Sequence, residues 1–242
     1  MFDCVIVNYN TTLLTNACIR SLKNTGTSCR ITVFDSSDEE PLELYEDGVN
    51  VIDNTKGQVI DFKKFLDQYP NKKPSSTNWA SPRHSKTIDT LFDLFPDGFV
   101  HLDSDIIVKR NLDELFNPNY AACASYIPAR IVRNKPSLRF PRLHPCVMYI
   151  NVPMCKEHNI RFFDDRRNMG LTRTPKMDTG CSFLQDIEKN HLPIKIINAE
   201  DYVAHLHMGS WKRETRLIKK FILTNMKYLE GLDEECLDTF SK

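Results

Sequence analysis

The chain has 242 residues, of which 41% are hydrophobic and 26% are charged, as is usual for a globular protein. Lysine plus arginine and aspartate plus glutamate both total 32, so the net charge is zero and no global field favours nucleic acid as a partner. No apolar run approaches the ~18 residues that a membrane span needs. This length fits one large domain or two small ones.

The cysteines predict a reducing compartment. All eight are scattered along the sequence, and none belongs to a Cys-x-x-Cys pair. Several lie in apolar stretches, where a reduced cysteine behaves as a small hydrophobic residue. The amino-terminal residues resemble a core strand and lack the basic start of a signal peptide. We therefore expect free thiols and a cytoplasmic location.

Short apolar runs alternate with helical patterns in the first half of the chain. The predicted strands are Asp3–Val7, Arg30–Phe34, Val49–Ile52 and Phe99–Leu102, and the predicted helices are Thr12–Lys23, Val59–Tyr69 and Ser85–Phe95. The polar, proline-containing stretch Pro70–Ser81 predicts a loop. This alternation implies an α/β fold with a mostly parallel central sheet and helices on both faces.

The second half is less regular. Its expected elements are a short helix at Asn111–Phe116, strands at Ala121–Tyr126 and Cys146–Val152, and a helix at Cys181–Asn190. The segments Ile127–His144 and Arg161–Lys176 are expected to be loops, and the first of them, with six basic residues and three prolines, is expected to cross the active face. The basic amphipathic pattern of Lys212–Leu229 predicts a helix, which either packs one face on the protein or lies on an anionic membrane as a peripheral contact.

Polar residues follow three of the predicted strands at their carboxyl ends, where sheets of this class bind ligands. These groups are Asn8-Tyr9-Asn10, Asp35-Ser36-Ser37 and Asp103-Ser104-Asp105. Residues at i and i+2 of an extended segment point to the same side, so the two carboxylates of the third group converge. Convergent carboxylates suit a hard divalent cation that also holds phosphate oxygens. The alternative is a polar turn with solvated charges.

Four segments resemble the GT-A class of nucleotide-sugar glycosyltransferases. Val5–Asn10 resembles the first strand and turn of the family-2-like members, and Val33–Asp38 resembles the end of their second strand. His101–Asp105 resembles their Asp-x-Asp metal motif, and His205–Trp211 resembles a late His-x-Gly-type segment. The resemblance implies one GT-A-like domain over residues 1–242, with a nucleotide-binding half at 1–110 and an acceptor-binding half at 111–242. It also implies metal-dependent transfer of a sugar from a nucleoside-diphosphate sugar, expected to be UDP-sugar, to the hydroxyl of a glycan, lipid-linked or protein acceptor.

The resemblance assigns metal ligands. Asp103 and Asp105 are expected to hold Mn²⁺ or Mg²⁺, with His207 preferred to His205 as the third protein ligand. An imidazole ligand favours Mn²⁺ over Mg²⁺. The alternative for the two histidines is that they pack against Trp211.

The resemblance also places residues around the nucleotide. Val7 and Tyr9 are expected to lie beside the nucleobase, and Asp35 is expected to accept a hydrogen bond from it. Ser104 is expected to contact the ribose. Lys86, near a helix N-terminus, is expected to bind the phosphates, and Arg130 or Arg133 to provide further positive charge. The competing interpretations are plain packing for Tyr9, helix capping for Asp35 and a solvated surface position for Lys86.

Asp178 is the candidate general base that deprotonates the acceptor hydroxyl, and its alternative role is to cap the helix that follows. Two other functions remain open. One is a non-catalytic nucleotide-sugar-binding protein on a GT-A scaffold. The other is a sugar nucleotidyltransferase, against which the lack of glycine in Asn8–Thr12 argues.

Overall fold

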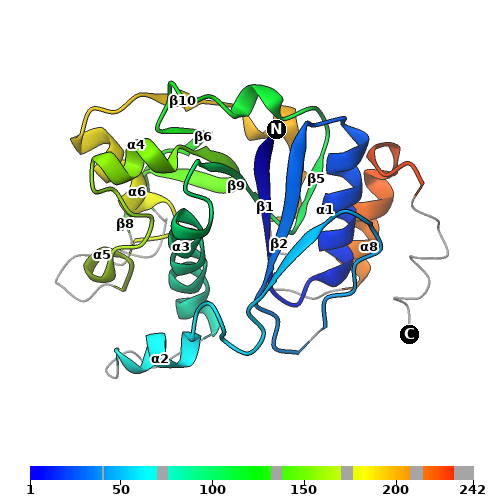
Figure 1. Cartoon of the computed structure of the whole chain (residues 1–242), viewed down its shortest axis with the longest axis horizontal. Helices are drawn as coiled ribbons and strands as arrows, with labels where there is room; N and C mark the ends of the chain where they lie inside the picture. The colour runs from blue at the N-terminus through cyan, green and yellow to red at the C-terminus, as the bar shows by residue number, and fades with distance from the viewer. Residues whose placement is uncertain (40, 70–75, 132–137, 170–176, 208–214, 232–242) are drawn as a thin grey trace.

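The computed structural model describes residues 1–39, 41–69, 76–131, 138–169, 177–207 and 215–231. Its centre is a seven-stranded sheet with the strand order β10-β6-β9-β4-β1-β2-β3 (Figure 1). The strands are β1 (Phe2–Asn8), β2 (Cys29–Asp35), β3 (Asn50–Asp53), β4 (Phe99–Asp103), β6 (Ala122–Ile127), β9 (Arg142–Ile150) and β10 (Ile194–Ile196). Every neighbouring pair is parallel except those of β9, which runs antiparallel to β4 and β6. The mostly parallel sheet predicted from the sequence is confirmed.

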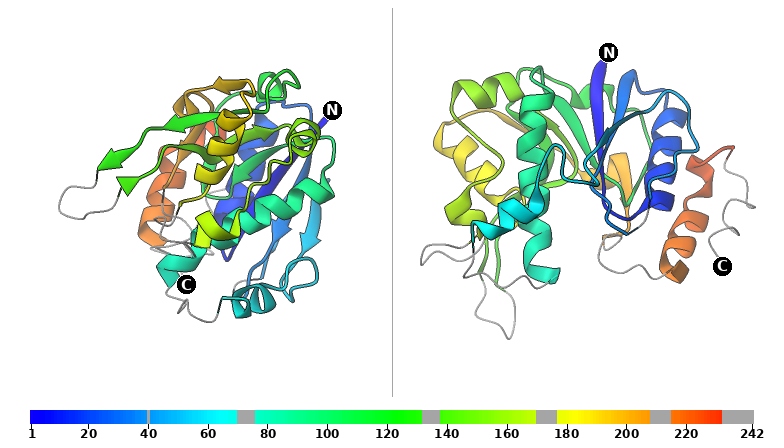
Figure 2. Two further views of the ribbon diagram at one scale, coloured as in Figure 1. Left: turned by 90° about the vertical axis from the view of Figure 1, so that its left-hand side faces the viewer. Right: turned by 60° about the horizontal axis from the view of Figure 1, so that its bottom comes forward.

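Helices cover both faces of this sheet (Figures 1 and 2). They are α1 (Thr12–Asn24), α2 (Phe62–Asp67), α3 (Ser76–Leu94), α4 (Val152–Glu157), α5 (Asp165–Met169), α6 (Cys181–Lys189), α7 (Ala199–Tyr202) and α8 (Thr215–Thr224). On one face, Ile19 and Leu22 of α1 join a buried cluster with β1, β2 and β4. On the other face, Leu91 of α3 and Phe183 of α6 pack in a second cluster. The sheet is therefore buried on both sides, which explains why its strands read as continuous apolar runs.

Two small ladders lie beside the main sheet. β5 (Ile106–Val108) pairs antiparallel with β11 (Val203–His205), and β7 (Arg130–Ile131) pairs with β8 (Leu138–Arg139). The first ladder places His205 opposite Ile106, directly after the Asp103-Ser104-Asp105 turn. It therefore brings the last third of the chain back to the end of β4.

The helix before β4 was predicted too short. α3 begins at Ser76, so the predicted helix start at Ser85 and the predicted loop to Ser81 are wrong over these residues. The prediction failed because Pro82 usually ends a helix, yet here it lies inside α3. Ile88 and Leu91, both fully buried, fix the helix to the sheet and outweigh this local cost. In contrast, α2 is shorter than the predicted Val59–Tyr69, because Asp61 caps it by accepting a hydrogen bond from the Lys64 amide.

The predicted active-face loop Ile127–His144 is partly strand. β9 begins at Arg142, four residues before the predicted start, and the β7–β8 ladder lies between β6 and β9. The pairing of β6 with β9 is interrupted by a register shift between Ala124 and Ser125. Such a bulge bends the strands locally.

The carboxyl-terminal amphipathic pattern forms α8 and a short 3₁₀ turn, Met226–Tyr228, instead of one long helix. Part of the apolar side of α8 packs on the protein, since Ile222 is fully buried in a cluster with Ala17 of α1 and Ile107 of β5, whereas Leu217 and Leu223 are exposed. The predicted packing of one face is present, and the predicted membrane contact stays a prediction. Among the described residues, no helix is long and apolar enough to cross a bilayer.

Seven cysteines lie in the described part of the chain, and all seven are free thiols. Six of them are buried, where they pack as small apolar side chains. Cys236 lies outside the described residues.

Candidate metal and nucleotide site

The two aspartates of the Asp-x-Asp sequence stand where β4 ends. Asp103 is the last residue of β4, and Ser104 and Asp105 form a turn into β5. Buried apolar residues on both sides, Leu102 and Ile106, hold this turn in place. Asp105 is only 8% exposed, so its carboxylate lies in a largely desolvated position.

The β5–β11 ladder brings an imidazole to this turn. His205 Nε2 lies 3.2 Å from Asp105 Oδ1, and the Leu206 amide donates to the Asp105 carbonyl at 3.0 Å. Ligand atoms of Asp103, Asp105 and His205 all lie within 4.8 Å of one another. Two carboxylates and one imidazole therefore converge from two segments of the chain, the β4–β5 turn and β11.

The pKa shifts of these groups describe a concentrated negative charge. Burial raises the pKa of Asp103, and the charge of Asp105 adds to this effect although His101 opposes it. Burial alone lowers the pKa of His205, but the hydrogen bond and charge of Asp105 outweigh it, so the pKa is raised. The site attracts positive charge because two carboxylates share a region of low polarity.

These residues fit a divalent cation. Carboxylate oxygens are ligands for hard divalent ions, and one imidazole nitrogen is a suitable companion for Mn²⁺. The fit is supported by the proximity of Asp103 and Asp105, whose mutual repulsion a cation removes.

His207, the histidine preferred from the sequence, occupies a different position. Its ring centroid lies 4.2 Å from that of His205, and its side chain is exposed. Its backbone adopts the left-handed conformation, with φ of 66°, after β11 has ended at His205. The structure thus brings His205, the second choice, into direct contact with Asp105. Trp211 lies outside the described residues.

The ends of β1 and β2 are joined by a polar network. Asp35 Oδ1 accepts hydrogen bonds from Asn8 Nδ2 at 2.9 Å and from both the amide and the hydroxyl of Ser37. Asp35 is 4% exposed, so this network fixes the turn that follows β2. The helix-capping role considered for Asp35 is wrong, because a loop and not a helix follows.

Tyr9 lies at the edge of this network. Its hydroxyl donates to Asp38 Oδ2 at 2.8 Å, and the guanidinium of Arg83 lies 4.6 Å from its ring centroid. Tyr9 is half-buried and is held by polar contacts as well as packing. Val7 is adjacent in space to the metal candidates, because it pairs with Asp103 across β1 and β4.

Ser104 is fixed by α1. Its hydroxyl lies 2.8 Å from that of Thr11, which in turn donates to Asn8 Oδ1 at 2.8 Å. This chain of hydrogen bonds connects the Asp-x-Asp turn with the first strand. The predicted nucleobase and metal residues are therefore parts of one connected polar region.

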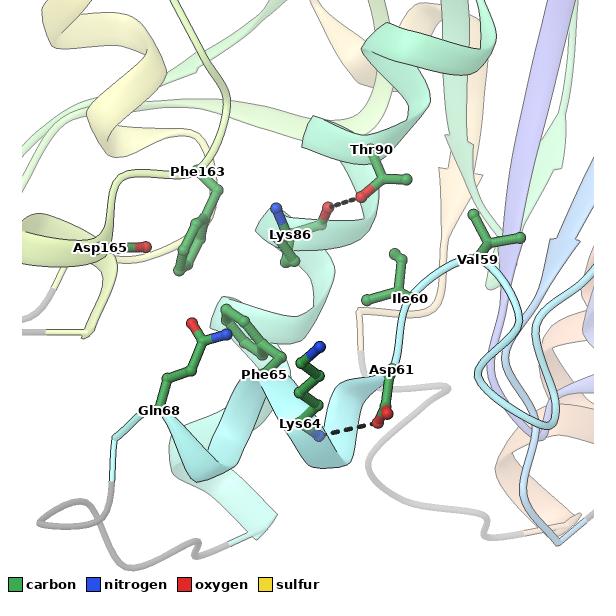
Figure 3. Close-up of a pocket in the computed structure, with 10 residues that line it drawn as sticks. All are labelled: Val59, Ile60, Asp61, Lys64, Phe65, Gln68, Lys86, Thr90, Phe163 and Asp165. Carbon is green, nitrogen blue, oxygen red and sulfur yellow. Dashed lines mark hydrogen bonds between the residues drawn. The ribbon is translucent and has the colours of Figure 1, made fainter.

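Lys86 is not placed with the acidic pair. Its ammonium lies 3.8 Å from Asp89 Oδ2 and faces a cavity of about 390 Å³ between α2, α3 and the segment before α5 (Figure 3). Since α3 begins at Ser76, Lys86 is also far from the helix N-terminus, and that part of the prediction is wrong. His84, two residues earlier, turns toward Asp103 instead, as expected for positions about 200° apart on a helix.

Asp178 forms an ion pair with Arg142 of β9, and its Oδ1 accepts from the Thr179 amide at 2.9 Å. The alternative role as a helix cap is wrong, because the N-cap of α6 is Gly180. The side chain of Arg142 is near the acidic pair, since its charge acts on both Asp103 and His205. Arg133 and the side chain of Arg130 lie outside the described part of the chain.

Sequence reasoning missed three further residues of this region, namely His84, His101 and Arg142. Burial lowers the pKa of both His84 and His101 to about 4, so both rings are neutral at physiological pH. A signal for His101 was present, since it precedes Asp103 by two positions on a strand and therefore shares its face. His84 and Arg142 gave no such signal, because their positions depend on the packing of α3 and β9.

Comparisons with known proteins agree on the architecture. No family model matches the chain, and no curated protein matches it. The structure of mouse xyloside xylosyltransferase 1 in its apo form is similar over 82% of this chain and 85% of its own, with 12% identity and a TM-score of 0.50. The galactosyltransferase LgtC with donor and acceptor sugar analogues is similar over 81% of this chain and 73% of its own, with 14% identity and a TM-score of 0.48.

The bifunctional glycosyltransferase WbbM matches over 82% of this chain, with 16% identity and a TM-score of 0.47. This chain spans only 39% of the length of WbbM and 46% of that of the glycosyltransferase GlyE from Streptococcus pneumoniae. At these identities the likeness concerns the fold. The seven-stranded sheet flanked by helices, as in the xylosyltransferase, confirms the GT-A architecture predicted from the sequence.

Proposed function

We propose that this protein is a metal-dependent glycosyltransferase, which moves a sugar from a nucleoside-diphosphate sugar, expected to be UDP-sugar, to an acceptor hydroxyl. The acceptor classes that fit are a glycan, a lipid-linked sugar or a protein side chain. The observation that carries the proposal is the convergence of Asp103, Asp105 and His205 within 4.8 Å at the carboxyl end of β4, on a GT-A fold.

In this proposal Asp103, Asp105 and His205 hold the cation, and His205 takes precedence over His207 because of its contact with Asp105. Mn²⁺, or Mg²⁺ in its place, supplies positive charge that stabilises the diphosphate leaving group. The protein's own part is to fix the two carboxylates on the rigid β4–β5 turn, so that they need no rearrangement when the donor binds.

The nucleoside is proposed to lie against the polar network at the ends of β1 and β2. Tyr9 and Val7 border the space next to Asp103, and Asp35 holds the turn that shapes it. Ser104, joined to Thr11, faces the same region and is proposed to contact the ribose. Lys86 keeps its predicted phosphate role only if its side chain leaves the cavity of Figure 3.

Nucleotide binding is the first expected outcome. Calorimetric titration with UDP, GDP and CDP is expected to show binding of one nucleotide, UDP, that requires Mn²⁺ and disappears with a chelator. Binding with no turnover of any UDP-sugar contradicts the transfer step and indicates a non-catalytic binding protein. The absence of binding by all three nucleotides, with or without the ion, contradicts the whole proposal.

The base role of Asp178 gives a second expected outcome. Asp178→Asn keeps an oxygen for the Thr179 amide, so the loop is expected to stay folded. Loss of a general base lowers kcat by about 10²–10⁴-fold, and nucleotide affinity stays the same. The measurement is UDP release from the UDP-sugar that binds, with Asp97→Asn in the exposed turn before β4 as the matched control. If kcat is unchanged and only thermal stability falls, Asp178 serves to hold Arg142.

A further inference from the structure

A second group of potential metal ligands lies beside the Asp105–His205 pair. His101 precedes Asp103 by two residues on β4, so the two side chains share one face of the strand. α3 crosses this face and directs His84 toward it. Three side chains from two elements therefore meet on the side of Asp103 that faces α3.

Three single atoms define this group. His84 Nε2 lies 3.2 Å from His101 Nε2 and 3.4 Å from Asp103 Oδ1, and His101 Nε2 lies 3.9 Å from the same oxygen. These three distances form a triangle, and the point in its plane that is equally far from all three atoms lies about 2.05 Å from each. Zinc bonds to nitrogen and to carboxylate oxygen measure about 2.0–2.2 Å. The atoms are thus spaced as the ligands of one ion.

The position of the ring proton of His101 also leaves a nitrogen lone pair for a cation. His101 Nδ1 lies 2.7 Å from the Pro145 carbonyl, which can only accept, so the ring proton is on Nδ1. In the neutral ring, Nε2 then carries a lone pair, which faces His84 and Asp103. When Asp103 is ionised, only His84 can supply a proton between the three atoms, and it can serve just one of the two acceptors at a time.

The hydrogen bond from His101 to the Pro145 carbonyl is also typical of histidines that bind metals. Histidines that bind metals almost always donate their other ring N–H to a carbonyl or carboxylate, which fixes the tautomer and the orientation of the ring. His101 is fully buried and has this arrangement. The side chains of His84 and Asp103 are 24% and 19% exposed, so an ion can enter from solvent.

We propose that His84, His101 and Asp103 form a binding site for a transition-metal ion of the zinc class, with three protein ligands and a fourth position open to solvent. Two imidazoles and one carboxylate select Zn²⁺ over Mg²⁺, which prefers oxygen ligands in octahedral geometry. Asp103 also belongs to the Asp103–Asp105–His205 group, so the two groups share this residue. The proposal goes beyond nucleotide-sugar transfer and does not depend on it.

The test uses the full chain with metal alone, without nucleotide. Co²⁺, which replaces Zn²⁺ in such sites, is expected to give the intense visible absorption of four-coordinate cobalt, and Zn²⁺ is expected to abolish it. His84→Gln is the main variant, because His84 is partly exposed and its loss leaves the core intact. We expect at least ~100-fold weaker Zn²⁺ binding and no intense cobalt absorption, since losing a ligand costs more than losing an outer contact.

Two further variants separate the possible outcomes. His158→Gln, at the C-cap of α4 and outside every described group of potential ligands, is the matched control and is expected to keep the absorption. His205→Gln removes a ligand from the two other described groups, Asp103–Asp105–His205 and His144–Cys146–His205, and is also expected to keep the absorption. Absorption that survives His84→Gln but is lost in His205→Gln overturns the proposal, as does the absence of Zn²⁺ binding by the unmodified protein. Failure of nucleotide binding together with a His84-dependent cobalt signal overturns the transferase function alone.

Discussion

Asp105→Asn is expected to weaken Mn²⁺-dependent UDP binding by about 10³-fold, which corresponds to ~4 kcal/mol. The substitution keeps the size of the side chain but removes a negative charge that is 8% exposed and lies 3.2 Å from His205. A cation held by Asp103 and His205 alone loses half of its carboxylate ligands. The measurement is calorimetric titration of UDP at saturating Mn²⁺.

The metal-free form of this variant is expected to stay folded. Asp105 contributes to the raised pKa of Asp103, so its charge opposes the ionisation of its neighbour in the metal-free protein. Asp105→Asn therefore leaves the metal-free chain folded, and thermal unfolding checks this. Asp97→Asn applies the same chemical change at the exposed amino-terminal side of β4 and is expected to alter neither property. Undiminished UDP binding by Asp105→Asn contradicts the assignment of this carboxylate.

Gly180→Ala is expected to lower the free energy of unfolding by ~3–5 kcal/mol, or to shift the melting temperature by roughly 10 °C. Gly180 is the N-cap of α6 and has φ of 83°, a conformation that disfavours side chains. A Cβ at this position meets the Leu143 carbonyl oxygen of β9 at 2.1 Å, so α6 and β9 have to move apart. Because both Asp178 and Arg142 border this contact, sugar transfer is expected to fall as well.

The control isolates the steric part of this effect. Gly26→Ala has a similar φ of 67°, and a Cβ there meets nothing within 4 Å. It is expected to cost only the conformational term, about 1–2 kcal/mol. Equal losses of stability in the two variants, measured by thermal or urea unfolding, indicate that the close approach of α6 and β9 contributes nothing.

The first strand and helix of the fold could be predicted because their signals are local. β1 and α1 match their predicted bounds to within one residue, since a buried apolar run and a helical pattern each follow from residues near in sequence. β9 could not be placed in this way. Its position between β4 and β6 depends on antiparallel pairing with strands distant in sequence, so its length was underestimated.

The same distinction applies to the candidate site. The aspartates were found because the turn between β4 and β5 is a continuous stretch of sequence. The choice between the two late histidines depends on the backbone, since β11 ends at His205 and the chain turns to positive φ at His207. His84 escaped prediction because its meeting with His101 requires the rotation of α3 over the sheet, which no local pattern specifies.

The pairing of β5 with β11 has a consequence for how the protein is made. Asp105 and His205 are separated by 100 positions in the sequence, and they meet only after the second strand of this ladder has formed. During synthesis the sheet core from β1 to β4 emerges from the ribosome long before residue 205. A nascent chain therefore carries its carboxylates without their imidazole partner, and full cation affinity arises only at a late step of folding.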